Sequence, residues 1–105
     1  FILGKGTDPA RILVRAIGPT LTDAGISAVL ADPTLQLRDA NGVTVRENDD
    51  WKQTQQTEIE ATGIPPRNDR ESAIVATLTP APYTAILSGK NGGVGVGLVE
   101  VYQLQ

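Results

Sequence analysis

Short apolar runs separated by turn residues are the feature of this sequence that most restricts its fold. Each run spans only a few residues and is bounded by Gly, Pro, Asn or Asp. This spacing is typical of strands in a sandwich or barrel. The expected strands are 1–3 (a short stub), 11–17, 34–38, 43–47, 72–79, 83–88 and 94–104. The pattern therefore predicts an all-β protein, which we expect to be a two-layer antiparallel β-sandwich with about seven strands.

The best-defined unit of this pattern is a hairpin. Leu35 and Leu37 alternate with polar residues, and so do Val43 and Val45 in the next run. The connection between the two runs contains Asn-Gly at positions 41–42, which is the strongest short-range hairpin signal. We expect two antiparallel strands joined at this turn.

A chain of 105 residues is expected to form one domain, with boundaries 1–105. Only 4% of the residues are aromatic, so Val, Ile, Leu and Ala must fill the core. The net charge of −3 argues against nucleic acid as a partner. The acidity is concentrated in the middle of the chain, where we place an acidic helical insert at about 48–71. Its helix is expected at 54–62, with Thr54 or Thr57 as the N-cap and Gly63 as the terminator.

Three of the expected strands are apolar on both faces. They are 11–17, 72–79 and 94–104, whereas a strand in a two-layer sandwich needs only one apolar face. Two explanations stay open at this point. Either the acidic insert and the segment 19–32 cover the outer faces within one subunit, or neighbouring modules cover them. The glycines at 93, 95 and 97 indicate close packing of one strand face, with Trp51 as a candidate neighbour.

Catalytic chemistry has few candidates in this chain. The sequence has no His and no Cys, so the common nucleophile–base pairs and the His- or Cys-based metal sites are absent. The serines lack the Gly-x-Ser-x-Gly context. We therefore expect a protein that is not an enzyme and that needs no cofactor. No run of 18 apolar residues is present, so membrane insertion is not expected either.

One group of oxygen-bearing side chains carries a calcium hypothesis. Asp39, Asn41, Asp49 and Asp50 lie close together in the sequence, and Ca²⁺ takes six to eight oxygen ligands from such loops. The alternative is that Asp39 and Asn41 shape the hairpin turn while the residues at 48–49 cap backbone groups. Similarly, Arg11 and Arg15 are expected to play structural roles, bonded to carbonyls or to an acid of the insert.

Two stretches suggest a family. The residues 11–21, followed by Ala-Asp-Pro-Thr-Leu at 31–35, resemble a repeat found in large secreted and surface proteins of environmental bacteria. Asn-Asp-Asp-Trp at 48–51, the residues 78–85 and Leu-Val-Glu-Val-Tyr at 98–102 extend this resemblance across nearly the whole chain. The second half is also similar in pattern to the bacterial pre-peptidase C-terminal domain, a jelly-roll-like β-sandwich attached to secreted hydrolases, and this resemblance implies a jelly-roll-like form here. The insert departs from that second pattern.

The resemblance implies an extracellular or cell-surface location, a β-sandwich and a non-catalytic role. We expect a structural module that repeats or polymerises, with neighbouring copies of itself or adjacent modules as partners. The absence of methionine fits a processed chain or a piece of a longer one. An accessory carbohydrate- or protein-binding domain of a secreted hydrolase is the alternative. The residues expected to make the assembly contacts, through strand addition at either end, are Phe1, Ile2, Leu3, Val99, Val101, Tyr102 and Leu104.

Overall fold

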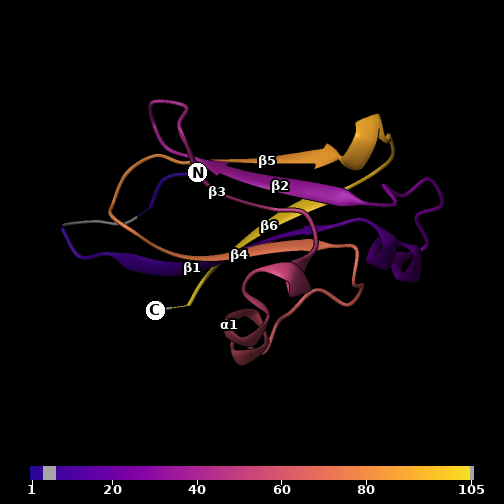
Figure 1. Ribbon diagram of the computed structural model, residues 1–105, viewed down its shortest axis with the longest axis horizontal. Helices are drawn as coiled ribbons and strands as arrows, with labels where there is room; N and C mark the ends of the chain where they lie inside the picture. Colours follow the sequence, from indigo (N-terminus) through magenta and orange to yellow (C-terminus); the bar gives the residue numbers. More distant parts are fainter. Residues whose placement is uncertain (4–6, 105) are drawn as a thin grey trace.

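The computed structural model describes residues 1–3 and 7–104, and its strands form two antiparallel sheets (Figure 1). The strands are β1 (Ala10–Ile17), β2 (Pro33–Arg38), β3 (Thr44–Asn48), β4 (Ser72–Leu78), β5 (Thr84–Gly89) and β6 (Leu98–Gln103). The helical segments are η1 (Pro19–Ala24), η2 (Trp51–Gln53), α1 (Gln56–Ala61) and η3 (Lys90–Gly92). One sheet has the order β4-β1-β6 and the other β3-β2-β5. The predicted all-β sandwich is therefore confirmed.

The part of the chain that the structure describes has six strands rather than about seven. The difference lies at residues 1–3, where Ile2 makes an isolated bridge with Pro82 instead of a strand. Leu3 N donates to Ala81 O at 3.0 Å and Tyr83 N donates to Phe1 O at 2.7 Å. The segment is thus attached to its own chain just before β5.

The core between the two sheets follows the alternation of the strands. Ile12, Val14 and Ala16 of β1 face this core, and each is fully buried. Their antiparallel partners on β4 include Ile74 and Ala76, and β2 contributes two leucines from the opposite sheet. Every second residue of these strands therefore points into the sandwich, as the sequence pattern predicted.

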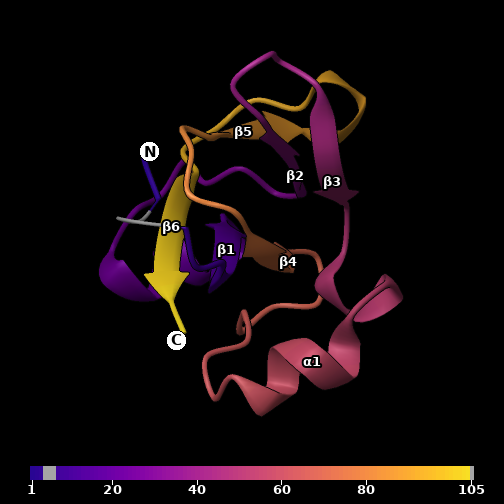
Figure 2. The ribbon, with the colours of Figure 1, turned by 90° about the vertical axis from the view of Figure 1, so that its left-hand side faces the viewer.

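The other face of the β4-β1-β6 sheet is covered by the insert. Figure 2 shows α1 below this sheet and the second sheet above it, so that β1 lies between two covering layers. Trp51 and Ile59 pack with Leu13 of β1 and with Ala73 and Val75 of β4. This arrangement decides between the two explanations for the doubly apolar strands β1 and β4. The insert covers their outer faces within one chain, so they require no neighbouring module there.

The hairpin of β2 and β3 forms as predicted, but a bulge changes which side chains it buries. Asp39 N donates to Val43 O, and Gly42 takes the left-handed φ of 79° that favours glycine. The register then shifts between Leu37 and Arg38. Because of this shift, Leu37 lies opposite Arg46, and Val45 is 41% exposed instead of joining the core.

The helix of the insert lies within the predicted range 54–62, but the prediction of its N-cap residue is wrong. Gln55, not Thr54 or Thr57, is the N-cap residue, and no side chain caps the helix. The side chain of Gln55 instead bonds to the edge of β4. The predicted terminator is confirmed, because Gly63 follows the helix with a φ of 79°.

Glu71 is fully buried and connects the segment that follows β1 with the segment that precedes β4. Its Oε2 accepts from the N–H groups of Gly18 and Thr20, both at 2.9 Å. Its Oε1 accepts from the Thr20 hydroxyl at 2.6 Å and from Asn68 N at 3.1 Å. Four donors replace the water that this carboxylate loses on burial, so the carboxylate holds the residues after β1 against those before β4.

The glycine-rich segment before β6 packs closely, as expected, although against different neighbours. A Cβ at Gly97 would lie 2.4 Å from Leu87, and one at Gly95 would lie 2.6 Å from the backbone of Leu30. Trp51, the candidate neighbour, instead belongs to the layer under the sheet. No helix in residues 1–3 and 7–104 has the length and hydropathy that a membrane span needs.

Candidate functional site

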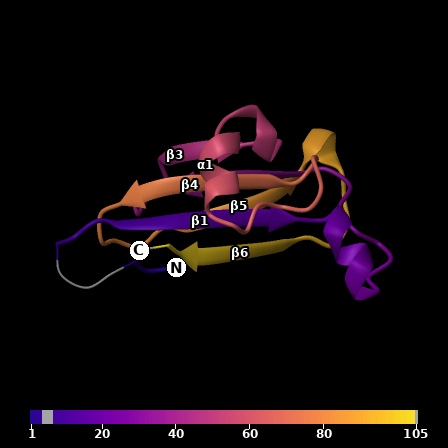
Figure 3. The same ribbon diagram turned by 90° about the horizontal axis from the view of Figure 1, so that it is seen from below.

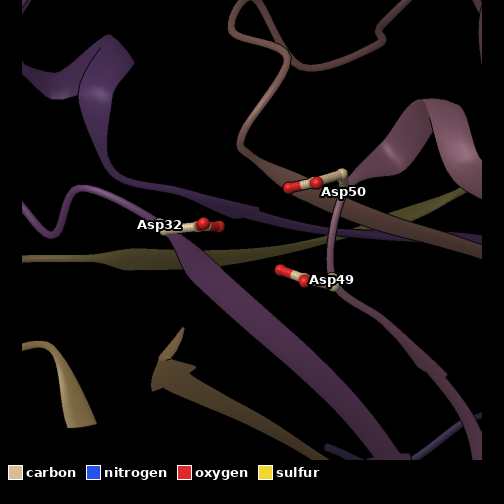
Figure 4. A group of neighbouring side chains, drawn as sticks. All are labelled: Asp32, Asp49 and Asp50. Carbon is tan, nitrogen blue, oxygen red and sulfur yellow. The ribbon is translucent and has the colours of Figure 1, made fainter. Parts of the chain in front are cut away.

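Three aspartates meet where β2 begins and β3 ends. Asp32 immediately precedes β2, and Asp49 and Asp50 immediately follow β3. Because these strands are antiparallel neighbours, the start of one lies beside the end of the other. One carboxylate oxygen from each residue lies within 4.8 Å of the others. Figure 4 shows the three side chains pointing towards a common space. We call this group the aspartate cluster.

Lys90 contacts the aspartate cluster. Lys90 Nζ lies 2.7 Å from Asp49 Oδ2, and the backbone N–H of Lys90 donates to Asp32 O at 2.9 Å. The hydrogen bond to Asp49 raises the pKa of Lys90. Desolvation, followed by the charges of Asp49 and Asp50, raises the pKa of Asp32. The charges of Lys90 and Arg70 act in the opposite direction on the pKa of Asp32, so these two cations balance part of the negative charge of the cluster.

Each carboxylate of the cluster also keeps one oxygen without a hydrogen-bond donor. These oxygens are Oδ1 of Asp32, Asp49 and Asp50, each with less than 1 Å² exposed and no partner among the described residues. By contrast, Asp49 Oδ2 bonds to Lys90, and Asp50 Oδ2 accepts from Gln53 Nε2 at 3.3 Å. Chemically, a set of three carboxylates without His or Cys suits a hard cation bound through oxygen.

The structure separates the four residues of the calcium hypothesis. Asp49 and Asp50 join the aspartate cluster, whereas Asp39 and Asn41 belong to the hairpin turn. Asp39 Oδ1 accepts from the backbone N–H of Asn41 at 2.9 Å and of Val43 at 3.0 Å. Asp39 thus shapes the turn, as the alternative stated. The sequence reasoning missed Asp32, which is 17 positions away from Asp49 in the chain.

The residues expected to make assembly contacts differ widely in exposure. Phe1 is 39% exposed, Ile2 79% and Val101 40%, while Leu3 is buried at 7%. The remaining three, Val99, Tyr102 and Leu104, are half-buried and pack against the core clusters. Three further apolar side chains near β6 are exposed and were not singled out from the sequence: Val94 (90%), Val96 (45%) and Leu98 (44%).

A polar contact set holds β6 to β1 on the outer face. Arg15 Nε donates to Glu100 Oε1 at 2.8 Å, and Arg15 Nη2 donates to the Tyr102 hydroxyl at 2.9 Å. Arg15 Nη1 also donates to Ile64 O at 3.1 Å. The expected structural role of Arg15 is therefore present, with a carbonyl of the insert as one partner. Its acidic partner, however, is Glu100 of β6 and not an acid of the insert.

The edge of β4 is closed by side chains. Ala73 N donates to Asn48 Oδ1 at 3.0 Å. Val75 N donates to Gln55 Oε1 at 3.0 Å, and Val75 O accepts from Gln55 Nε2 at 2.9 Å. The Gln55 amide thus takes the hydrogen bonds that a neighbouring strand would make, which is one way of protecting a sheet edge.

The edge of β6 has no such closure at Val99 and Val101. Leu104 N donates to Arg11 O on β1, so the backbone groups of the alternate residues 99 and 101 point away from β1. No side chain within the described part of the chain bonds to them. Figure 3 shows β6 on the opposite side of β1 from β4. The exposed side chains of Leu98 and Val101 accompany this open backbone.

A hollow with a mixed apolar and polar lining lies near the hairpin turn. It has a volume of about 420 Å³, and its lining includes Asp39, Asn41, Val45 and Tyr83.

Tyr83 is only 7% exposed, and its hydroxyl donates to Thr79 O at 2.7 Å. Trp51 is also buried, at 5%. The row of exposed aromatic rings on which a carbohydrate would stack is thus not formed by these two residues.

The sequence matches no family model, and no curated protein or solved structure resembles the chain significantly.

Proposed function

We propose that this protein is a non-catalytic structural module whose copies associate through the open edge of β6. The observation that carries this proposal is the difference between the two edges of one sheet. Asn48 and Gln55 close β4, whereas Val99 and Val101 of β6 have backbone groups available for another strand. An added strand would satisfy these groups with main-chain hydrogen bonds.

Exposed apolar side chains beside the same edge support this proposal. Leu98 and Val101 are 44% and 40% exposed on β6, and Val96 is 45% exposed in the segment before it. Their burial in an interface would be favourable at about 25 cal/mol per Å² of apolar surface. Strand pairing would therefore set the register between two copies. Burial of apolar side chains would supply the free energy of association.

The remaining parts of the proposal rest on the sequence. The absence of His and Cys supports a non-catalytic role. The resemblance of residues 11–35 and 98–102 to bacterial surface repeats supports a unit of an extracellular surface protein or fibre. In this setting the partner is an identical copy or an adjacent module of the same kind.

The test is the association state of the protein and of two matched valine variants. Sedimentation velocity over a wide concentration range should show reversible association of the unmodified chain. Val101→Lys should shift it to monomer, because a lysine at the edge would place a charge in the interface. Val45→Lys is the control, because Val45 is 41% exposed on β3 and belongs to the other sheet.

Three outcomes would contradict the proposal. They are a monomeric chain at all concentrations, equal association of Val101→Lys and the unmodified protein, and loss of association only in Val45→Lys. Unfolding curves of both variants must show that each remains folded. Retention of a monomeric chain on insoluble polysaccharide would instead favour the accessory binding domain.

A further inference from the structure

We propose that two copies of this chain pair their β6 strands antiparallel about a two-fold axis that passes between the Val101 residues of the two copies. This inference rests on the proposed function, because it presupposes association through the β6 edge. It names the partner and the register of that association. The partner is a second copy that presents the same strand, so the two β4-β1-β6 sheets become one continuous sheet.

The bonded edge of β4 argues against the alternative in which copies join head to tail. In that arrangement β6 of one copy would pair with β4 of the next, and the sheet would continue without closing. Asn48 and Gln55, however, already bond to the backbone of β4. β6 lies at the other outside of the sheet (Figure 3). In the described part of this sheet, β6 is therefore the edge that remains for another copy.

The symmetry limits the direction and the registers of the pairing. Two copies that use the same edge of one strand run antiparallel about a two-fold axis perpendicular to the sheet. The backbone groups of Val99 and Val101 point away from β1, towards this edge. Outward-pointing residues of the two copies must lie opposite one another to exchange hydrogen bonds. Near the middle of β6, this condition is met when Glu100, Val101 or Tyr102 lies on the axis.

The charges on β6 favour the register centred on Val101. With Glu100 on the axis, two carboxylates would lie directly opposite each other, which is destabilising in a sheet. With Val101 on the axis, Glu100 lies opposite Tyr102 of the second copy. These two groups are complementary, because the Tyr102 hydroxyl donates to Glu100 Oε2 at 2.9 Å within one chain.

The leucines at the ends of this segment favour the same register. Leu98 stands three positions before Val101 and Leu104 three positions after it, so each would face the other leucine of the second copy. Leu98 is 44% exposed and Leu104 is half-buried, so this contact would bury apolar surface. With Tyr102 on the axis, Leu104 would instead lie opposite the charged side chain of Glu100.

Val101 itself would be covered by its own counterpart. Its side chain is 40% exposed in the single chain. Antiparallel residues that exchange both hydrogen bonds have Cα atoms about 5.5 Å apart, so the two Val101 side chains would touch. On the outer face, Arg15 lies opposite Glu100 and bonds to it at 2.8 Å. This register therefore places Arg15, Glu100 and Tyr102 of the second copy in one row across the interface.

A two-fold interface of this kind is closed. Each copy uses its β6 edge in the pair, and the same edge is then no longer available to a third copy. We therefore expect association through β6 to stop at the dimer. A fibre built from this module would need a second contact surface.

The experiment is disulfide cross-linking, because the chain has no cysteine and a single introduced thiol can form a disulfide only with another copy. Val101→Cys should give a covalent dimer on mild oxidation, since a Cα separation of about 5.5 Å is within the reach of a disulfide. Leu98→Cys is the matched control, because Leu98 is 44% exposed and Val101 40%. In the proposed register the two Leu98 residues are separated by six residues along the strand, or about 20 Å.

Val101→Cys should therefore cross-link at least about tenfold faster than Leu98→Cys, which lies beyond disulfide reach of its counterpart. The double variant of Leu98→Cys with Leu104→Cys should restore cross-linking, because these two positions face each other between copies. It also provides the test if Val101→Cys proves to be unfolded. Glu100→Cys reports the register with Glu100 on the axis and should cross-link as slowly as Leu98→Cys.

Two results would overturn the two-fold pair and leave association through β6 intact. One is cross-linking of Leu98→Cys or Glu100→Cys as fast as that of Val101→Cys. The other is sedimentation of the unmodified chain as species larger than a dimer, all of which Val101→Lys converts to monomer. If the unmodified chain is monomeric and no cysteine variant cross-links, the two-fold pair and the proposed function fail together.

Discussion

β4 and β6 are the two edges of the same sheet, and their surroundings differ in almost every respect. Beyond β4 the chain supplies the insert, whose Gln55 side chain bonds to both backbone groups of Val75. Beyond β6, the corresponding groups of Val99 and Val101 have no side-chain partner within the described residues. A module that must not aggregate needs to protect its edges. A sheet with a protected β4 edge and an open β6 edge is the arrangement expected if copies of the module associate through β6 and not through β4.

The comparison extends to the outer face of the sheet. At β4 this face is apolar and lies under Trp51 and Ile59. At β6 it carries Glu100 and Tyr102, which bond to Arg15. The β4 side is thus held mainly by burial, and the β6 side by half-buried polar contacts. The two sides should therefore respond differently to substitution and to pH.

The largest effect is expected from removing the aromatic ring that covers the β4 side. Trp51→Ala should lower the free energy of unfolding by about 3–5 kcal/mol, because it leaves a cavity beneath the sheet. Urea denaturation measures this change. Phe1→Ala is the control, since Phe1 is 39% exposed, and its cost should stay below about 1 kcal/mol. Equal losses in the two variants would show that the insert does not act as a cover.

The buried carboxylate before β4 should rank second. Glu71→Ala leaves the donors of Gly18, Thr20 and Asn68 without an acceptor and should cost about 3 kcal/mol. Glu58→Ala, at an exposed position of α1, should change the same unfolding free energy by about 0.5 kcal/mol or less. A small loss at Glu71 would mean that water replaces the carboxylate at no great cost.

Removing the side chain that protects the β4 edge should have a smaller effect on the free energy of unfolding. It should have a measurable effect on amide hydrogen exchange. Gln55→Ala should cost about 1–2 kcal/mol, because it removes both hydrogen bonds to Val75. Amide hydrogen exchange at Val75 should become faster, and sedimentation should then detect association through β4. Gln56→Ala, the next residue, should alter neither measurement. Unchanged exchange at Val75 would contradict the proposed edge protection.

The smallest effect is expected on the stability of the β6 side at alkaline pH. The hydrogen bond to Glu100, together with desolvation, raises the pKa of Tyr102. A raised pKa means that the folded state holds the phenol proton more tightly than the unfolded state. The corresponding stability is present below pH 10, the unperturbed value, and is lost as the pH rises through the folded pKa.

Hydrogen exchange measured on both sides of this range should therefore show faster opening of β6 relative to β4 at high pH. The variant Tyr102→Phe should lose this difference, because it has no phenol proton to release. Equal acceleration in β4 and β6 of the unmodified protein would indicate that Tyr102 has no local role.

Local patterns were enough to predict most of the strands. The alternation at Leu35 and Leu37 and the Asn-Gly turn are properties of a few adjacent residues, and they located β2 and β3 within one or two positions. The role of Gln55 was not predictable in this way. It depends on the insert returning along β4, and its partner Val75 is 20 positions further on.

The aspartate cluster had a signal in the sequence that the reasoning did not use. Leu35 pairs with Asn48 at the end of the hairpin away from the turn. Asp32 lies three residues before Leu35, and Asp49 and Asp50 follow Asn48 directly. Extending the predicted hairpin to its open end would therefore have placed these carboxylates near one another. The bulge and the exposure of Val45, in contrast, depend on tertiary packing.

The central position of β1 also has a consequence for how the molecule forms. Both partners of β1 come from the second half of the chain: Val14 pairs with Ile74 on one side and with Val101 on the other. The β2–β3 hairpin, in contrast, joins strands that are close in the sequence. Folding rates fall as contacts become less local. We therefore expect the β2–β3 hairpin to close early and the β4-β1-β6 sheet to form in the slow step of folding.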